Sequence, residues 1–596
     1  MREELPRRIK ARRGFSVVYR GKTLLSVLDP IAQAERIAAR AHKTGRTLYV
    51  CPSPLLGYGL LSILNTMSGD SALLCVETDE NLMAFSLAEM DREILGHPSV
   101  RLVRVRDPAS LCSYVRSQWG ERAFRRIEPL RLGGGWQLDP ETYNGLARAL
   151  KRNIAVDWGN AATLIRLGRL YARNAARNLA LLPESGTIDD LDFGPAPVLV
   201  LGAGPSLDRI LGELKSLLVP ERRFKIICVD TALSVLNSFS VTPDLVVALE
   251  AQHWNIGDFI GSRGRDIPLA LDLSALPGSG GLLGRRFFFS TPWAPLAFFD
   301  RLREYSLLPP RLPPLGSVGL SAVALALILS SGPILTGALD FSFSVDGFHA
   351  KAAPAGIAWL CRQNRLSGFI NAEAAVRRGV FAAVSKERKR VLSTISLKNY
   401  RDLFEEEFSG EKRMRDLLSS GLPLGIPIVN LEEARAILAS GGSVKSGEAA
   451  DGETTERGVA ANAGGGAAER GVAANAGGAA AERGGGTTGR GAGLSGGEAK
   501  KEQVLAFIGN ELSMLRTLRA ALTGEGGTGK EEFERLLDAC DYLWAHFPEC
   551  AGAGGKRPAL YGEDSEAALS FLKRVRAELD PFISCFERAG ELVNAP

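Results

Sequence analysis

The chain has 596 residues, of which 45% are hydrophobic and 23% are charged, and its formal net charge is +5 at pH 7. This length and apolar content allow several buried cores and predict about three or four domains. The net charge is too small for the chain's size to indicate a nucleic-acid partner. The basic stretch at 7–13 is interpreted as a solvated tail, the alternative being a membrane or nucleic-acid contact.

The eight cysteines are scattered and form no C-x-x-C pair, so we expect reduced thiols, no zinc site and a cytoplasmic location. No apolar segment typical of a signal peptide follows Met1. The longest apolar stretch, at 318–329, is too short to cross a bilayer, and we expect a buried helix there. The protein is therefore expected to have no integral membrane segment.

The first folded block is predicted at residues 1–144. Its apolar runs at 47–51 and 72–77 predict strands, and a degenerate glycine turn follows the first of them. This arrangement is typical of a Rossmann-like domain. Glu77 stands at the end of the second strand, where nucleotide-binding folds hold ribose hydroxyls; alternatively, it only caps the next helix.

A helical connector is predicted at 145–192, because leucines and Tyr171 recur at helical spacing there. Its asparagines at 160, 174 and 178 are interpreted as exposed polar positions, the alternative being hydrogen bonds to neighbouring chain. Near the other end of the sequence, the composition at 439–500 is dominated by Gly and Ala and predicts a disordered linker. Amphipathic stretches at 501–596 predict a small α-helical domain.

The central block, predicted at 193–438, repeats a short apolar run that ends on a polar or glycine-bearing tip. The six runs lie at 197–206, 225–231, 244–252, 267–274, 285–291 and 333–341. Continuous apolar runs suit strands covered on both faces, and amphipathic stretches separate most of them. The alternation predicts an α/β fold with a doubly wound, mostly parallel sheet. Ligands bind such sheets outside the carboxyl ends of the strands, so we expect one cleft there.

The sharpest motif follows the first of these strands and reads Gly202-Ala203-Gly204-Pro205-Ser206. Glycine lets the backbone approach a ligand closely, and proline is tolerated in the first turn of a helix. Free N–H groups at such a turn suit a nucleotide phosphate. The third glycine of a dinucleotide fingerprint is replaced by Leu207, so the motif fits either a nucleotide site or a tight structural turn.

Further polar residues stand at the later strand ends and at the start of the apolar helix. The candidates for binding a ligand there are Asp230, Thr231, Glu250, Gln252, Gly316 and Ser317. Asp340 ends the sixth run, and His349 follows it in a polar loop. A loop histidine beside a nucleotide site suits a general base, because its ordinary pKa is near neutral. The alternative is a surface histidine with a structural role.

Four motifs in this order resemble the motility-associated factor (Maf) family. They are LGAGPSL at 201–207, VDTALSVLNSFSVTPDLVVALEAQ at 229–252, GSVGLSAVALAL at 316–327 and GALDFSFSVDGFHA at 337–350. Members of that family are bacterial flagellin glycosyltransferases that contain a pterin-pyrophosphokinase (MptE)-like domain once called DUF115. The resemblance covers about residues 14–438 and implies a Rossmann-like domain followed by the catalytic domain.

The central block also resembles bacterial sialyltransferases that use CMP-sialic acid. This resemblance implies that 202–206 faces the phosphate and ribose of the donor, while Asp230 and Glu250 occupy the positions of two asparagines. It implies that the helix start at Ser317 holds the sugar or the cytidine phosphate, and that Asp340 orders the floor of the site.

The chain departs from both groups of relatives. The base histidine of the sialyltransferases lies farther along the chain than His349, so the base role of His349 is our own inference. The sialyltransferases set tyrosines beside the leaving phosphate, whereas only Tyr305 and Tyr400 occur between 193 and 438. The pterin pyrophosphokinases have an acidic Asp-Leu-Asp-Gly motif at the third strand end, which binds magnesium-ATP. This chain has Ala-Leu-Glu-Ala-Gln at 248–252 instead. A single carboxylate is a poor magnesium clamp, which argues against a kinase.

Together the resemblances imply a glycosyltransferase that moves a nonulosonic, sialic-acid-like sugar from a CMP donor to Ser or Thr of flagellin, for flagellar assembly and motility. No cofactor or metal is expected. His349 is the base candidate and Asp340 its neighbour in the catalytic pair. The donor-binding candidates are Gly202, Ala203, Gly204, Pro205, Ser206, Asp230, Thr231, Glu250, Gln252, Gly316 and Ser317. The alternatives are a non-catalytic flagellar accessory protein and a pterin-type pyrophosphokinase. The mechanism requires His349 to lie close to Gly204.

Overall fold

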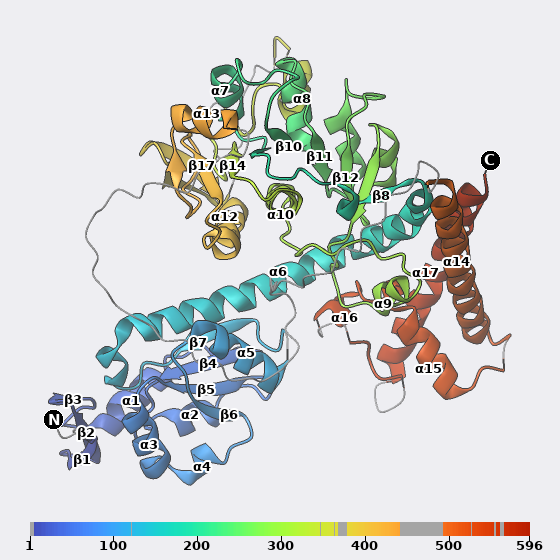
Figure 1. Ribbon diagram of the computed structural model, residues 1–596. Coiled ribbons are helices and arrows are strands. Elements are labelled where there is room, and N and C mark those ends of the chain that lie inside the picture. The colour runs from blue at the N-terminus through green and yellow to red at the C-terminus, as the bar shows by residue number, and fades with distance from the viewer. Residues whose placement is uncertain are drawn as a thin grey trace, which may run out of the picture. The chain divides into compact units, whose positions relative to one another are not determined.

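The computed structural model describes residues 5–120, 122–345, 347–362, 364–366, 378–440, 493–525, 527–552, 556–560 and 565–595. Most of the predicted linker, 441–492, lies outside the described residues. The chain forms two compact units (Figure 1). Unit 1 contains Met1–Gly168 and Trp544–Phe571, and unit 2 contains Arg169–Leu543 and Leu572–Pro596.

Unit 1 is built on a four-stranded sheet with the order β6-β5-β4-β7, in which every pair of strands is parallel. The strands are β4 (Thr47–Pro52), β5 (Ala72–Glu77), β6 (Val100–Arg104) and β7 (Arg126–Pro129). The helices that accompany them are α1 (Pro30–Ala38), α2 (Leu60–Leu64), α3 (Glu80–Glu89), α4 (Arg92–Leu95) and α5 (Pro108–Trp119). This parallel sheet confirms the predicted Rossmann-like domain.

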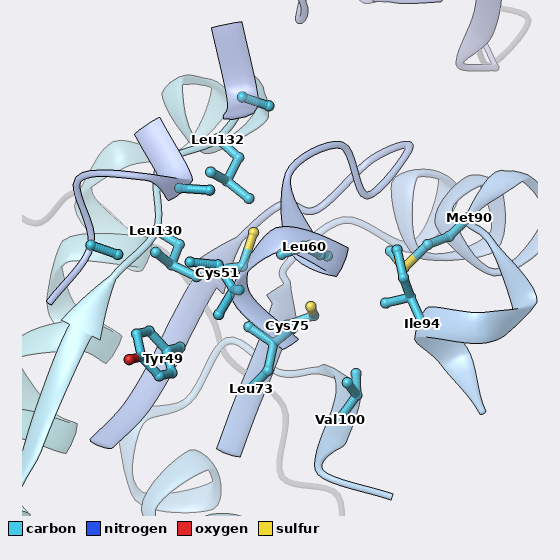
Figure 2. Close-up of a cluster of buried hydrophobic side chains, with 14 residues drawn as sticks. Tyr49, Cys51, Leu60, Leu73, Cys75, Met90, Ile94, Val100, Leu130 and Leu132 are labelled. Carbon is cyan, nitrogen blue, oxygen red and sulfur yellow. The ribbon is translucent and has the colours of Figure 1, made fainter. Parts of the chain in front are cut away.

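Both faces of β4 and β5 are buried, which explains their continuous apolar runs. Tyr49, Cys51, Leu73 and Cys75 enter the cluster drawn in Figure 2. Their neighbours in the same strands enter a second cluster on the opposite face. Because side chains alternate between the two faces of a strand, burial of both faces leaves no polar position to interrupt the run.

The basic stretch at 7–13 is not the solvated tail that we expected. Arg7–Lys10 forms strand β1, which pairs antiparallel with β2 (Phe15–Tyr19), and β2 pairs with β3 (Lys22–Thr23). Glu77 is 0% exposed. Its carboxylate accepts hydrogen bonds from the N–H of Thr78 and from the hydroxyl of Tyr143, the latter at 2.6 Å. Because a fully buried carboxylate is not available to a ribose, Glu77 is part of the core of unit 1.

Unit 2 contains a nine-stranded parallel sheet with the order β18-β17-β14-β9-β10-β11-β12-β13-β8. The predicted runs form β9 (Val198–Leu201), β10 (Lys225–Val229), β11 (Leu245–Ala248), β12 (Leu269–Asp272), β13 (Arg286–Phe289) and β14 (Ile334–Gly337). Three further strands extend the edges: β8 (Gly186–Thr187), β17 (Met414–Leu417) and β18 (Ile428–Val429). The doubly wound parallel sheet is confirmed.

The chain builds this sheet outwards from β9 to β13 and then returns to place β14 on the other side of β9. The helix that makes this return is α10 (Val318–Leu329), which packs against β9, β10 and β11. Helices α7 (Leu207–Glu213) and α8 (Asp230–Ser238) lie on the opposite face of the sheet (Figure 1). The strand order therefore reverses between β9 and β14, which is where open α/β sheets bind ligands.

Most of α10 is buried, as its apolar sequence predicts. The remaining elements of the central part are α9 (Ala297–Glu304), α11 (Pro354–Arg362), the hairpin of β15 (Val380–Val384) and β16 (Arg390–Thr394), α12 (Ile395–Phe408) and α13 (Leu431–Ala439). No helix within the described ranges is both long enough and apolar enough to cross a membrane.

Helix α6 (Pro140–Asn178) begins in unit 1, and its last turns belong to unit 2. The interpretation of Asn174 and Asn178 as exposed was wrong, because each is 1% exposed. The side-chain amide of Asn174 donates to the carbonyl oxygens of Ala251 and Ser274 at 2.9 and 3.1 Å. Asn178 donates in the same way to two carbonyls of the segment 273–275. These amides satisfy backbone acceptors beyond β11 and β12.

The C-terminal part is helical, as predicted, with α14 (Gly493–Thr523), α15 (Lys530–Ala539), α16 (Pro548–Gly552) and α17 (Ser565–Asn594). In unit 2, α14 packs against α9 through an ion pair between Arg301 and Glu511, whose Nε and Oε1 atoms lie 2.6 Å apart. The hydroxyl of Tyr542 donates to the same carboxylate at 2.9 Å. These contacts fasten α14 to the sheet domain, whereas Trp544–Phe571 belongs to unit 1.

Candidate active site

The glycine corner, Gly202–Ser206, lies where β9 and β14 end side by side. The N–H of Gly202 donates to the carbonyl of Gly337 at 2.9 Å, and that of Gly204 donates to Ala338 at 3.0 Å. A Cβ on Gly204 would lie 2.5 Å from Oδ2 of Asp340, so only glycine fits without rearrangement. The corner is therefore fastened along its length to the end of β14.

Asp340 binds the glycine corner through hydrogen bonds to Ser206. Its side chain is buried, and it accepts hydrogen bonds from the N–H of Ser206 at 2.8 Å and from the Ser206 hydroxyl at 2.7 Å. The hydroxyl of Ser419 is a third, longer donor at 3.4 Å. A carboxylate occupied by these donors positions the backbone around it. These hydrogen bonds agree with the ordering role that the resemblance implies for Asp340.

The hydrogen bonds of the corner limit what it can offer to a phosphate. Pro205 has no N–H, and the N–H groups of Gly202, Gly204 and Ser206 already donate within the protein. These three N–H groups therefore stabilise a tight structural turn, which was one of the two interpretations of the motif from the sequence. An anion at this edge therefore needs additional donors from a neighbouring element.

The N-terminus of α10 provides such donors beside the corner. Ser317 is the N-cap residue, and within the described residues its hydroxyl makes no capping bond to the helix. The first N–H groups of a helix have no partner inside it, and they carry the positive end of its dipole. The side chain of Leu339 lies between the two elements, because a Cβ on Gly202 or on Gly319 would come within 2.8 Å of its Cδ2 atom.

Two tyrosines lie close to Glu250 at the same edge. Burial raises the pKa of Tyr171 to about 12, with smaller contributions from the charges of Glu250 and Asp272 and from Tyr400. Burial and the charge of Glu250 likewise raise the pKa of Tyr400. A Cβ on Gly316, just before α10, would lie 3.5 Å from the ring of Tyr400. Both phenols keep their protons at neutral pH and remain hydrogen-bond donors.

Tyr171 was missed as a site residue. It lies in α6, outside the range 193–438 in which tyrosines were counted, and its spacing suited the apolar stripe of the predicted connector. Asn255 was also missed, although it lies only three residues after Gln252. Tyr171 comes to this edge through packing between elements, which a local pattern does not contain.

His349 lies beside the glycine corner, close to Gly204, as the mechanism expected from the sequence requires. Its Nδ1 atom lies 3.3 Å from the carbonyl oxygen of Ala203, to which the N–H of Ala350 also donates, at 3.1 Å. A carbonyl only accepts, so we assign the proton to Nδ1, which leaves the lone pair on Nε2. Burial lowers the pKa of His349. The ring is therefore neutral at pH 7 and can accept a proton.

Asp230 and Thr231 lie at the start of α8. Asp230 is buried, and its carboxylate accepts from the N–H of Thr231 at 2.8 Å and from the side-chain amide of Asn255 at 2.6 Å. Burial, followed by the charge of Asp258, raises the pKa of Asp230 to about 7. The carboxylate joins α8 to the segment after β11. Because Asp230 is only 3% exposed, its carboxylate is not accessible to a nucleotide-sugar donor.

Glu250 and Gln252 follow β11. Glu250 is exposed, and its Oε1 atom accepts from the N–H of Gln252 at 2.9 Å. Of the acidic candidates, Glu250 is the one whose carboxylate reaches solvent at this edge. In the part of the chain that the structure describes, no group of three or more His, Cys, Asp or Glu side chains is placed to hold a metal ion.

A known protein family matches the central part of the chain. Residues 171–346 match the model of a protein family described as "6-hydroxymethylpterin diphosphokinase MptE-like". An "Uncharacterized protein" of Treponema pallidum (strain Nichols) is 28% identical over 595 residues, which cover 98% of this chain and 95% of that protein.

One similar solved structure is that of the "MAf glycosyltransferase from Magnetospirillum magneticum AMB-1", with a TM-score of 0.46 and 14% identity. The similarity covers 98% of this chain and 92% of that one. The family match confirms the MptE-like (DUF115-type) domain that the motifs predicted: it begins at Tyr171 in α6 and extends beyond β14, so that it includes the glycine corner, α10 and the whole run from β9 to β14.

Proposed function

We propose that this chain is a glycosyltransferase that moves a nonulosonic sugar from a CMP donor to a Ser or Thr hydroxyl of flagellin, in the cytoplasm, for flagellar assembly and motility. The observation that carries the proposal is the meeting of three kinds of group at one sheet edge. They are the uncapped start of α10, the protonated phenols of Tyr171 and Tyr400, and the neutral ring of His349 on the glycine corner.

The start of α10 is the proposed site of the donor phosphate. Its N–H groups and dipole favour an anion, and the Ser317 hydroxyl and the Tyr400 phenol lie at the same end of the helix. The glycine corner shapes the adjoining wall, and its engaged N–H groups keep that wall rigid. CMP leaves as a monophosphate, whose charge these donors can stabilise in the transition state without a metal.

The reaction then needs one proton acceptor. The hydroxyl oxygen of the acceptor attacks the anomeric carbon of the sugar, and the bond from that carbon to the phosphate oxygen breaks. CMP departs with the bonding electron pair, while the hydroxyl proton moves to Nε2 of His349. The lowered pKa of His349 supports this role, because the ring holds no proton of its own on Nε2 at neutral pH.

The description of the matched family supports a second candidate, a 6-hydroxymethylpterin diphosphokinase. Such an enzyme would transfer diphosphate from magnesium-ATP to a pterin hydroxymethyl group. The single exposed carboxylate that follows β11, Glu250, is a weak basis for a magnesium site there. The third candidate, a non-catalytic accessory protein, would use the same fold to bind flagellin without transferring a sugar.

The experiment is to incubate the purified full chain with CMP-nonulosonate and flagellin and to measure the intact mass of flagellin. We expect a mass increase of one sugar residue. His349→Gln should lower the rate by about 10²–10⁴-fold, as loss of a general base does. Tyr400→Phe should lower it by about 10²-fold through the loss of one oxyanion donor. The matched control is Tyr305→Phe, because the ring of Tyr305 packs on Phe507 of α14.

The outcomes separate the candidates. Formation of AMP from ATP in the presence of 6-hydroxymethyl-dihydropterin, with no change in flagellin mass, would establish the diphosphokinase. Binding of flagellin without a mass change or nucleotide turnover would establish the accessory protein. A full transfer rate in His349→Gln would refute the assignment of the base.

A further inference from the structure

Unit 2 contains a cavity of about 570 Å³ beside the candidate active site. It lies between α8, the 3₁₀ helix η4 (His253–Phe259) and the start of α11. Small-molecule sites in proteins have volumes of this order, with apolar walls and a few polar groups. The function proposed above uses the start of α10 and His349 and leaves this cavity without a role.

The walls of the cavity expose large apolar side chains. Trp254 and Ile260, at the two ends of the η4 segment, are 72% and 74% exposed, and Ile357 of α11 is 45% exposed. All three line the same cavity. Apolar side chains gathered around a hollow, and not scattered over the surface, are typical of a binding site.

The polar groups of the cavity are acidic. Glu250 and Asp258 both line it, and no Lys, Arg or His is found among the described residues that do so. The amide of Asn255 donates to Asp258 at 3.1 Å and to the buried Asp230 at 2.6 Å. Burial, and then the charge of Glu250, raises the pKa of Asp258 to about 6. The negative charge of Glu250 therefore disfavours the charged form of Asp258.

This charge excludes the anionic parts of the proposed donor from the cavity. Among the described residues that line the cavity, a phosphate or a sugar carboxylate would meet two carboxylates and no cationic side chain. The complementary ligand carries a positive head on an apolar stem, as the side chains of Lys and Arg do. A cation is attracted both by carboxylates and by the face of an exposed indole ring.

We propose that this cavity binds a Lys or Arg side chain of the acceptor polypeptide. The stem would lie along Ile260 and Ile357, and the charged head would lie between Glu250 and Asp258, against Trp254. The inference depends on the proposed function in one respect, namely that the acceptor is a protein.

The surroundings of the cavity suit this role. Glu250 also lies close to Tyr171 and Tyr400 of the candidate site, and its charge contributes to their raised pKa values. The hydroxyl of Ser234, in the cavity wall, donates to the carbonyl of Ala352 at 2.8 Å. This bond fixes the chain between His349 and α11. A basic side chain held in the cavity would thus anchor the polypeptide beside the proposed base.

The test measures peptide binding without any sugar donor. Two fluorescent peptides share one flexible glycine-rich sequence that contains a single Ser. They differ only in the residue next to this Ser, which is Arg in one peptide and Gln in the other. Fluorescence anisotropy with the full chain should give the Arg peptide at least about tenfold higher affinity. The double variant Glu250→Gln, Asp258→Asn should abolish this preference. The control Asp300→Asn, which removes an exposed carboxylate of α9, should retain it.

A second variant, Trp254→Ala, keeps the test valid if the double variant does not fold, because an indole that is 72% exposed contributes little to the core. It should weaken the Arg peptide and leave the Gln peptide unchanged. Equal affinity of the two peptides, or an Arg preference that survives in the double variant, would overturn the inference. So would preferential binding of a neutral methyl glycoside in competition with the Arg peptide. Peptide binding without sugar transfer would contradict the proposed function alone, whereas sugar transfer without Arg preference would contradict this inference alone.

Discussion

Replacing Gly204 by alanine tests whether Asp340 and the end of β14 dictate the glycine corner. The added Cβ would lie 2.5 Å from Oδ2 of Asp340 and 2.7 Å from the carbonyl oxygen of Ala338. Both distances are roughly 1 Å below an ordinary contact between heavy atoms. The carbonyl is backbone, and the carboxylate is held by two hydrogen bonds from Ser206, so neither atom can move away without loss.

Overpacking of a buried site typically costs about 1–3 kcal/mol. We expect Gly204→Ala to reach the upper part of this range, because relief of the contact would lengthen the bonds between Ser206 and Asp340, and hydrogen bonds to a charged group each contribute about 1.5–3 kcal/mol. Urea unfolding of the full chain, followed by circular dichroism, measures the loss. The free energy of unfolding should decrease, and the binding of CMP should weaken as the wall of the site shifts.

The matched control is Gly212→Ala, on the exposed side of α7. No atom lies within 4 Å of a Cβ built on Gly212. Alanine is favoured over glycine in a helix by about 0.8–1 kcal/mol, so this variant should be as stable as the natural chain or more stable. If Gly204→Ala unfolded at the same urea concentration as the natural chain, the described packing of the corner on Asp340 would be refuted.

Three further predictions concern buried polar groups of unit 2. The raised pKa of Asp230 means that the folded state binds its proton more tightly than the unfolded state does. Stability should therefore fall as the pH rises from about 4 to about 7. Urea unfolding midpoints measured across this range should fall less in Asp230→Asn. Glu511→Gln leaves the buried guanidinium of Arg301 without its charge partner and should lower the free energy of unfolding by about 3–5 kcal/mol. The control Arg303→Ala, on the exposed side of α9, should lower it by at most about 1 kcal/mol, as measured by thermal unfolding. Asn178→Ala leaves two backbone carbonyls without their donor and should cost about 1–3 kcal/mol, while Asn160→Ala, exposed on the same helix, should change calorimetric stability by less than about 0.5 kcal/mol. Equal losses within either matched pair, or an unchanged pH profile, would contradict the corresponding assignment.

The sheet of unit 2 could be predicted where the strands are buried on both faces. Strands β9 to β14 are central, and their side chains are apolar in unbroken runs, so the sequence pattern locates them. Strand β17 was not predicted, because its sequence, Met414–Leu417, includes Arg415 and Asp416. Asp416 is nevertheless buried, and it forms an ion pair with Lys386 at 2.9 Å, from the turn of the β15–β16 hairpin. A charged residue compensated by a partner thirty positions away cannot be distinguished from an exposed one by its local pattern.

The candidate site could be predicted where a single strand end supplies a motif, and not where packing between elements supplies it. The glycine corner and the loop that carries His349 follow neighbouring strands, so their proximity follows from the parallel topology. Tyr171 depends instead on how α6 packs. It shares one face of α6 with Asn174 and Asn178, three and seven positions further along. The two asparagines fasten that face to the carbonyls beyond β11 and β12, and this contact brings the tyrosine to the edge of the sheet. An aromatic residue and two amides on one helical face are thus a signal of a polar contact with the sheet, which a search for apolar stripes alone does not detect.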